Sequence, residues 1–171
     1  MSKTIQIELN NRSINKAIKE LRQYSAWIQK KEIELRKRLA ELGRDVAEVR
    51  FNNVIPSDGD RITVRVEDDG TKATIYAEGT EVVFIEFGTG AKFGYGHPTA
   101  GEYGFGPGTW SDGPEGKHHW NEKTKKGDYK GWWYGEEGKH TYGNPPAMGM
   151  YIAVKEITEN VTRIATEVFN H

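Results

Sequence analysis

The sequence predicts an α+β fold, in which a small antiparallel sheet is packed by a long N-terminal helix and a C-terminal helix. Two observations predict it: helical periodicity occupies both ends of the chain, and alternating residues between them indicate a β-hairpin. A third observation, a stretch rich in glycine and aromatic residues at 88–143, indicates a long loop insertion. We therefore expect a single domain over 1–171, with a core built from 1–87 and 144–171.

The N-terminal part combines a short strand with a long helix. Residues 4–9 alternate apolar and polar side chains, which predicts a half-buried strand. Ser13 is the candidate N-cap of a helix that runs to Phe51. The apolar side chains of this helix repeat as one heptad stripe: Ile14, Ile18, Leu21, Ile28, Leu35, Leu39, Leu42, Val46 and Val49. Such a helix would be roughly 58 Å long, so it either kinks near residues 25–32, which we favour, or projects beyond the domain.

The middle of the chain predicts a hairpin. Residues 56–60 form a loop, and residues 61–67 and 71–78 alternate as two strands would. The Asp-Asp-Gly sequence at 68–70 favours the turn between them. Residues 82–87 are a short apolar run, which is either a buried strand or one turn of helix.

The stretch 88–143 has an unusual composition. It contains no Ile, Leu, Val or Met, but it holds 15 of the 20 glycines and 11 of the 19 aromatic residues. Without branched aliphatic side chains it cannot build an ordinary core, whereas disordered segments are poor in aromatic residues. We expect a loop-rich excursion pinned by aromatic rings, with residues 132–134 as a short strand.

Helical periodicity returns after the insertion. Asn144 is a candidate N-cap, and Pro145 fits the first helical position. The predicted apolar stripe of this amphipathic helix consists of Tyr151, Val154, Ile157, Val161, Ile164 and Val168.

Composition and charge exclude several classes of protein. The absence of cysteine excludes disulfides, thiolate metal sites and cysteine nucleophiles. With 24 basic and 25 acidic residues and no long apolar run, we expect neither specific nucleic-acid binding nor a membrane span. The charge is uneven, because 1–55 carries 12 basic and seven acidic residues while 56–87 carries three and eight. Opposite charges of this size suit self-association between subunits.

The insertion also holds the residue types that chemistry would need. Four of the five histidines lie there: His97, His118, His119 and His140. Their spacing does not match a metal-ligand motif, so we expect no metal, no cofactor and no catalytic residues. Two alternative functions stay open. One is a carbohydrate-binding module that uses exposed aromatic rings, and the other is a metal-dependent nuclease or hydrolase built on the histidines. The aromatic platform of the first would be Trp110, Trp120, Trp132, Trp133 and Tyr134.

Two short motifs carry a family resemblance. The sequence Phe-Ile-Glu-Phe-Gly-Thr-Gly at 84–90 follows the predicted hairpin, and Gly-Asn-Pro-Pro at 143–146 opens the last helix. In this order they resemble the tail-component, or tail-completion, family of long-tailed double-stranded DNA phages, in the version found in phages and prophages of Gram-positive bacteria. The residues that match the family motifs are Glu86, Gly88, Thr89, Gly90, Gly143, Asn144, Pro145 and Pro146.

The resemblance implies a structural role. Members of this family are small virion proteins without catalytic residues, which act at the neck where a tail is joined to a DNA-filled head. It therefore implies contacts with other tail and neck proteins, a ring of copies, and a location in the virion after assembly in the host cytoplasm. We expect the 88–90 and 143–145 segments to meet and to close the base of the insertion. Glu86 either accepts hydrogen bonds from the loop it precedes or is an ordinary exposed strand carboxylate.

Overall fold

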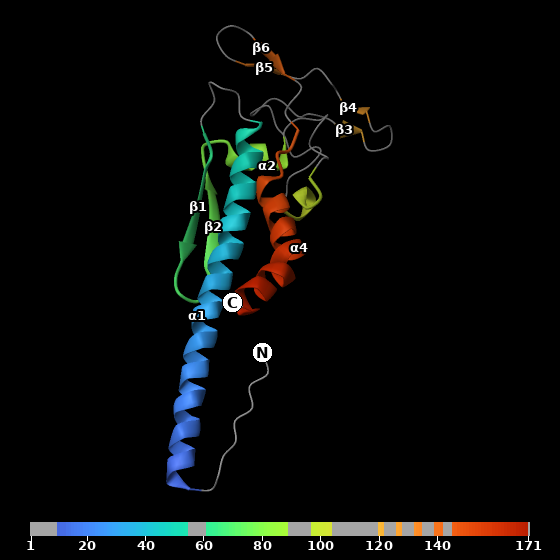
Figure 1. The fold of residues 1–171 in the computed structure, drawn as a ribbon. Coiled ribbons are helices and arrows are strands. Elements are labelled where there is room, and N and C mark those ends of the chain that lie inside the picture. Colours follow the sequence, from blue (N-terminus) through green and yellow to red (C-terminus); the bar gives the residue numbers. More distant parts are fainter. Residues whose placement is uncertain are drawn as a thin grey trace.

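The computed structural model places two helices and a hairpin side by side. It describes residues 10–54, 61–88, 97–103, 120–121, 126–127, 132–134, 139–141 and 145–170. The long helix α1 (Asn11–Asn52) packs against α4 (Gly149–Asn170), and the strands β1 (Thr63–Asp68) and β2 (Ala73–Glu78) lie beside α1 (Figure 1). The arrangement confirms the predicted α+β class, with helices packed on an antiparallel sheet.

The remaining elements are short. They are α2 (Val82–Phe87), the 3₁₀ helix η1 (Ala100–Tyr103), β3 (Trp120–Asn121), β4 (Lys126–Gly127), β5 (Trp132–Tyr134) and β6 (Lys139–Thr141). Among the described residues of the insertion, the strands form two small antiparallel ladders, β3 with β4 and β5 with β6. β5 confirms the strand predicted at 132–134. The strand predicted at 4–9 and the loop predicted at 56–60 lie outside the described residues. No helix within the described ranges is long and apolar enough to cross a membrane.

α1 is one continuous helix of 42 residues, so the expected kink is wrong. Sharp kinks need proline, a glycine–serine pair or a bulge, and a lone Ser25 supplies none of these. The N-cap is Asn10 rather than Ser13, because the Asn10 side chain accepts a hydrogen bond from the Ser13 N–H at 2.8 Å. α4 ends beside Trp27, where the Phe169 ring meets the Trp27 ring edge-on at 5.8 Å. The part of α1 before Trp27 therefore extends past the body of the protein, as Figure 1 shows.

The hairpin forms as predicted. β1 and β2 pair from Thr63 opposite Glu78 to Asp68 opposite Ala73. Arg36 of α1 joins the tip of the hairpin to the helix, since its guanidinium binds the Asp68 carboxylate at 3.1 Å and the Gly70 carbonyl at 3.0 Å. Gly70 has a φ of 91°, which is why the turn uses glycine there.

Asp69 organises the turn and makes it sensitive to acid. The Thr71 hydroxyl and the backbone N–H groups of Lys72 and Thr71 lower the pKa of Asp69 to about 2. A pKa below the unfolded value of about 3.9 stabilises the fold above that value, and the contribution is lost as the pH falls toward 2. Asp69→Asn keeps an acceptor oxygen that does not titrate. We expect this variant to lose less stability than wild type between about pH 5 and about pH 2 in urea unfolding. Equal losses would contradict this role.

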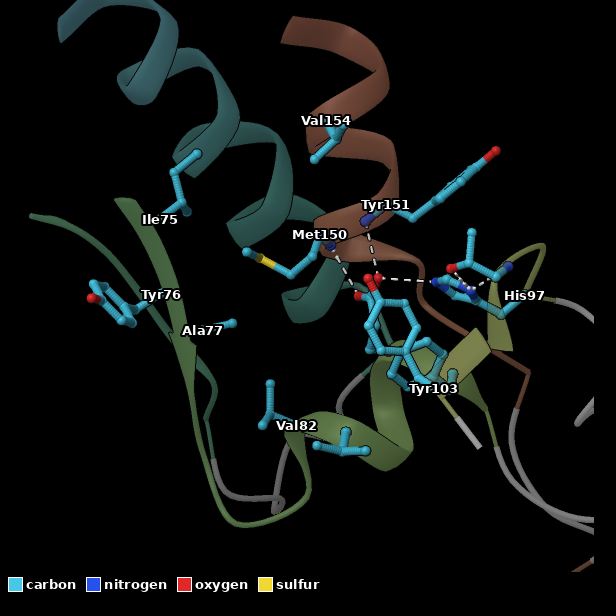
Figure 2. Close-up of a pocket in the computed structure, with 13 residues that line it drawn as sticks. Ile75, Tyr76, Ala77, Val82, His97, Tyr103, Met150, Tyr151 and Val154 are labelled. Carbon is cyan, nitrogen blue, oxygen red and sulfur yellow. Dashed lines mark hydrogen bonds and ion pairs between the residues drawn. The ribbon is translucent and has the colours of Figure 1, made fainter. Parts of the chain in front are cut away.

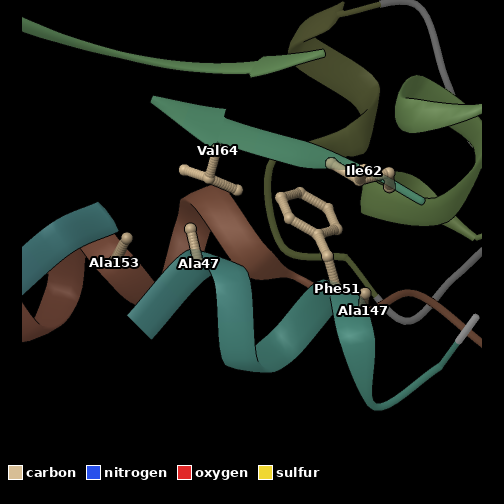
Figure 3. Close-up of a cluster of buried hydrophobic side chains, with 6 residues drawn as sticks. All are labelled: Ala47, Phe51, Ile62, Val64, Ala147 and Ala153. Atoms are coloured by element: carbon tan, nitrogen blue, oxygen red, sulfur yellow. The ribbon is translucent and has the colours of Figure 1, made fainter. Parts of the chain in front are cut away.

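The core lies between α1, the hairpin and the first turns of α4. Its fully buried aromatic ring is Phe51. The buried cluster around it, shown in Figure 3, consists of Ala47, Phe51, Ile62, Val64, Ala147 and Ala153. Small residues let the helices approach closely: a Cβ at Gly43 would lie 2.5 Å from Ile75 Cδ1 and 2.6 Å from Ile157 Cδ1.

The C-terminal helix differs from its prediction in two ways. It begins at Gly149 rather than at Pro145, and residues 145–148 are not helical. Met148 has a φ of 55°, which an α-helix does not accommodate. Its buried face matches the predicted stripe only in part. Ile164 and Val168 are buried as expected, whereas Val154 is 63% exposed and Ala153 is buried instead. A stripe drawn only through large apolar side chains misses the small residues of that face.

Candidate functional site

The junction of α2 and α4 holds the most buried acidic group among the described residues. The apolar run 82–87 was predicted to be either a buried strand or one turn of helix, and it forms the helix α2. Glu86 points from it toward α4 and is 7% exposed. Its carboxylate accepts hydrogen bonds from the Met150 N–H at 2.9 Å and the Tyr151 N–H at 3.0 Å, and lies 3.1 Å from His97 Nε2 (Figure 2).

Glu86 caps α4 from outside that helix. The first N–H groups of any α-helix lack partners within the helix, and the positive end of its dipole favours an anion. The Glu86 carboxylate supplies both acceptor oxygens to this end of α4. The reading of Glu86 as an exposed strand carboxylate is therefore wrong. The hydrogen bond that Glu86 was expected to accept from the insertion comes from His97. The hydrogen bonds from the N–H groups of α4 were not expected.

Hydrogen bonds and ring contacts hold His97 in place. Its Nδ1 accepts the Thr99 backbone N–H at 3.3 Å, so the ring proton lies on Nε2 and is donated to Glu86. The imidazole is 5% exposed and packs against the rings of Phe87 at 4.5 Å and Tyr151 at 5.3 Å. Both ring nitrogens are thus used, and His97 fixes the start of the insertion to α2 and α4.

The order of groups resembles that of a hydrolytic triad, but the contacts differ. The Thr99 hydroxyl also lies 3.3 Å from His97 Nδ1, so Thr99, His97 and Glu86 are connected in a series. A general base must use its free lone pair to take the hydroxyl proton. Here the Thr99 N–H already occupies that lone pair. Through these contacts the series joins the insertion to α2.

No metal site is present among the described residues, where no three ligating side chains gather. His97 is held by Glu86 and Thr99, as described above. The side chains of His118, His119 and His140 lie outside the described residues, as do all five rings of the predicted aromatic platform. The expectation of no metal therefore stays a prediction.

Backbone contacts join the first motif to the residues that follow the second. The Ala147 N–H donates to the Ile85 carbonyl at 2.8 Å, and the Met148 N–H donates to the Glu86 carbonyl at 3.2 Å. The end of α2 and the residues just before α4 therefore meet. The expected contact between 88–90 and 143–145 falls largely outside the described residues and stays a prediction. Pro145 and Pro146 belong to this second segment, and Pro146 is half-buried. The other motif residues, Thr89, Gly90, Gly143 and Asn144, lie outside the described residues.

Gly88 ends α2 with a backbone conformation that favours glycine. It is buried and has a φ of 78° and a ψ of 169°. A β-branched residue there is strained, at a cost of order 1–3 kcal/mol. We expect Gly88→Val to lower the free energy of unfolding by at least that amount in urea denaturation. Gly101→Val is the control, because Gly101 has open space around it. Equal effects of the two substitutions would contradict the assignment.

Next to this network lies an open apolar groove with a volume of about 580 Å³. β2, α2 and the first turns of α4 form its walls, and His97 lies at one end (Figure 2). Glu86, which contacts His97, also lines it. Several of the side chains that line it are exposed: Tyr76 at 38%, Val83 at 41%, Val154 at 63% and Tyr103 at 66%. An apolar hollow with exposed apolar walls is typical of a surface that binds another molecule.

Comparisons with protein-family models, with curated proteins and with solved structures found no significant match. Sequence reasoning singled out Glu86 through the 84–90 motif, but it did not connect Glu86 with His97 or Tyr151. His97 was one histidine among several in the insertion, and Tyr151 was assigned to the core stripe. No local pattern indicates a contact between residues that lie 64 and 65 positions apart, as Glu86 does from Met150 and Tyr151.

Proposed function

We propose that this protein is a non-enzymatic virion structural protein that completes the tail and joins it to the head of a long-tailed phage. It acts at the neck through contacts with other tail and neck proteins and with further copies of itself in a ring. The observation that carries the proposal is the extension of α1 past the body with its apolar stripe exposed. On this extension Ile14 is 39% exposed, Ile18 42% and Leu21 52%.

Two further observations support a structural role. Apolar side chains that recur on one exposed helix face mark surfaces that bind other proteins. In addition, Glu86 and Gly88, which belong to the motif that resembles the tail-completion family, have structural roles in this chain. Glu86 caps α4, and Gly88 turns the chain at the end of α2. Both oxygens of the Glu86 carboxylate are engaged by these hydrogen bonds.

The proposal is tested by deleting the gene from the phage or prophage that encodes the chain. Electron microscopy of the lysate should show DNA-filled heads and separate tails, and a plasmid copy should restore joined virions. A matched variant tests the non-enzymatic part. Thr99→Val keeps the shape and the N–H of this residue but removes its hydroxyl, so it should restore infectious titre fully. Intact virions without the protein, or a failure of this folded variant, would contradict the proposal.

A further inference from the structure

Two exposed apolar surfaces on this chain have complementary shapes. The first, here called the ridge, consists of Ile14, Ile18 and Leu21 on the extension of α1. Their spacing of i, i+4 and i+7 places them on one helix face, which is the pattern of helices that bind in grooves. The second is the apolar groove between β2, α2 and α4. A convex helix face and a concave apolar hollow can cover each other.

The ridge and the groove of one chain cannot meet. The groove is lined by Met150 and Tyr151 in the first turn of α4, and this turn packs on Phe51 near the end of α1. Ile18 lies about 50 Å from Phe51 along α1, at 1.5 Å per residue. α1 is continuous over this length and extends away from α2, as Figure 1 shows. The partner of each surface must therefore be another molecule.

The charges near the ridge favour pairing of a ridge with a groove over pairing of two ridges. The extension carries four basic side chains, all exposed: Arg12, Lys16, Lys19 and Arg22. Its one acidic residue before Trp27 is Glu20. Two such extensions would repel each other if they paired, because like charges would be brought together.

The groove has the opposite charge at its rim. Glu78, Glu81 and Glu102 each adjoin a lining residue in the sequence and are exposed. Neither Glu81 nor Glu102 forms an ion pair with any residue that the structure describes. Two basic groups nearby are already engaged, since Arg65 binds Glu67 and Glu78, and Lys155 lies 3.8 Å from Glu159. A basic amphipathic helix is thus attracted to this rim.

We propose that the ridge of one copy docks in the groove of the next copy. The contact joins two different surfaces, so it is heterologous and propagates from copy to copy until a ring closes. The inference rests on the ring in the proposed function and names the surfaces that build it.

Light scattering after size-exclusion chromatography tests the contact on the full chain. Wild type should show a mass well above the 19.4 kDa of one chain, rising with concentration. Leu21→Glu in the ridge and Val154→Glu in the groove should each weaken association about tenfold or more, because each places a charge in an apolar contact. Val49→Glu is the matched control, since Val49 is 59% exposed on α1 but belongs to neither surface. All three variants should keep the circular dichroism and melting temperature of wild type.

Mixing the two interface variants gives the sharpest result. The Leu21→Glu chain keeps an intact groove and the Val154→Glu chain keeps an intact ridge, so together they should form a complex of one chain each that grows no further. Pairing of ridges between copies would instead leave Val154→Glu fully associated and would give no such complex. That result, or a wild-type protein that stays monomeric at its highest soluble concentration, would overturn the inference.

A rival occupant of the ridge is the chain's own residues 4–9, because their alternating apolar side chains include Ile5, Ile7 and Leu9. Assembly that appears only after deletion of residues 2–9 would overturn the inference in favour of that occupant.

The phage from which the gene is deleted, described above, separates this inference from the proposed function. Unjoined heads and tails with a monomeric protein would leave the proposed function standing without this contact. Joined virions with an assembling protein would leave the contact standing without that function.

Discussion

Replacing Glu86 with alanine is expected to lower the free energy of unfolding by about 3–5 kcal/mol, because it leaves several buried donors without an acceptor. Three donors lose their acceptor at once: the Met150 and Tyr151 N–H groups and the His97 Nε2–H. A buried donor without a partner costs about 1–3 kcal/mol, and part of this cost is relieved if water enters. Urea unfolding followed by circular dichroism measures the loss.

Two other variants show whether the capping contact is the cause. Glu86→Gln retains one acceptor oxygen, so it should destabilise by less than the alanine variant. Glu81→Ala removes an exposed carboxylate that lies immediately before the same helix, and surface changes of this kind usually stay within about 0.5 kcal/mol. If Glu86→Ala were as mild as Glu81→Ala, Glu86 would not hold α4 in place.

The second large effect is expected where α1 meets the start of α4. Phe51→Ala should cost about 3–5 kcal/mol, because it empties the space of a fully buried ring. Gly149→Ala should cost about 1–3 kcal/mol for the opposite reason, since the added Cβ would lie 2.7 Å from the Phe51 ring. Denaturant midpoints with unchanged slopes would show that stability alone has changed.

The two substitutions should also be coupled. Phe51→Leu removes ring atoms that a Cβ at Gly149 would meet, so the double variant Phe51→Leu/Gly149→Ala should be more stable than the sum of its parts predicts. Residues in contact typically show coupling of about 0.5–3 kcal/mol. Additive effects would mean that α4 moves away from Phe51 instead of packing on it.

Periodicity in the sequence was sufficient for the elements and for the class of the fold. The heptad stripe of α1 and the alternation around Asp68-Asp69-Gly70 depend on neighbours within a few residues, and both predicted elements are present. Boundaries were less predictable, because several residues near each end can act as caps. The cap of α1 is Asn10 rather than Ser13, and α4 begins at Gly149, after Met148, rather than at Pro145.

The site was less predictable than the fold, because it depends on tertiary contacts. Glu86 stands in an apolar run, where one polar residue indicates either an exposed position or a buried partner. Only the packing of α4 on α2 shows that its partners are N–H groups about 64 residues away. A stripe in the sequence likewise cannot say where its partner ends, and α4 ends beside Trp27, well before the start of α1.

The most direct test of a role in head–tail joining is where the protein lies in a virion. Immunogold electron microscopy with an antibody against the exposed C-terminal residues of α4 should label the junction of head and tail in purified particles. Particles from the deletion strain serve as the control and should carry no label. Wild-type particles without label at this junction, or with label along the tail tube or on the head surface, would contradict the proposed function.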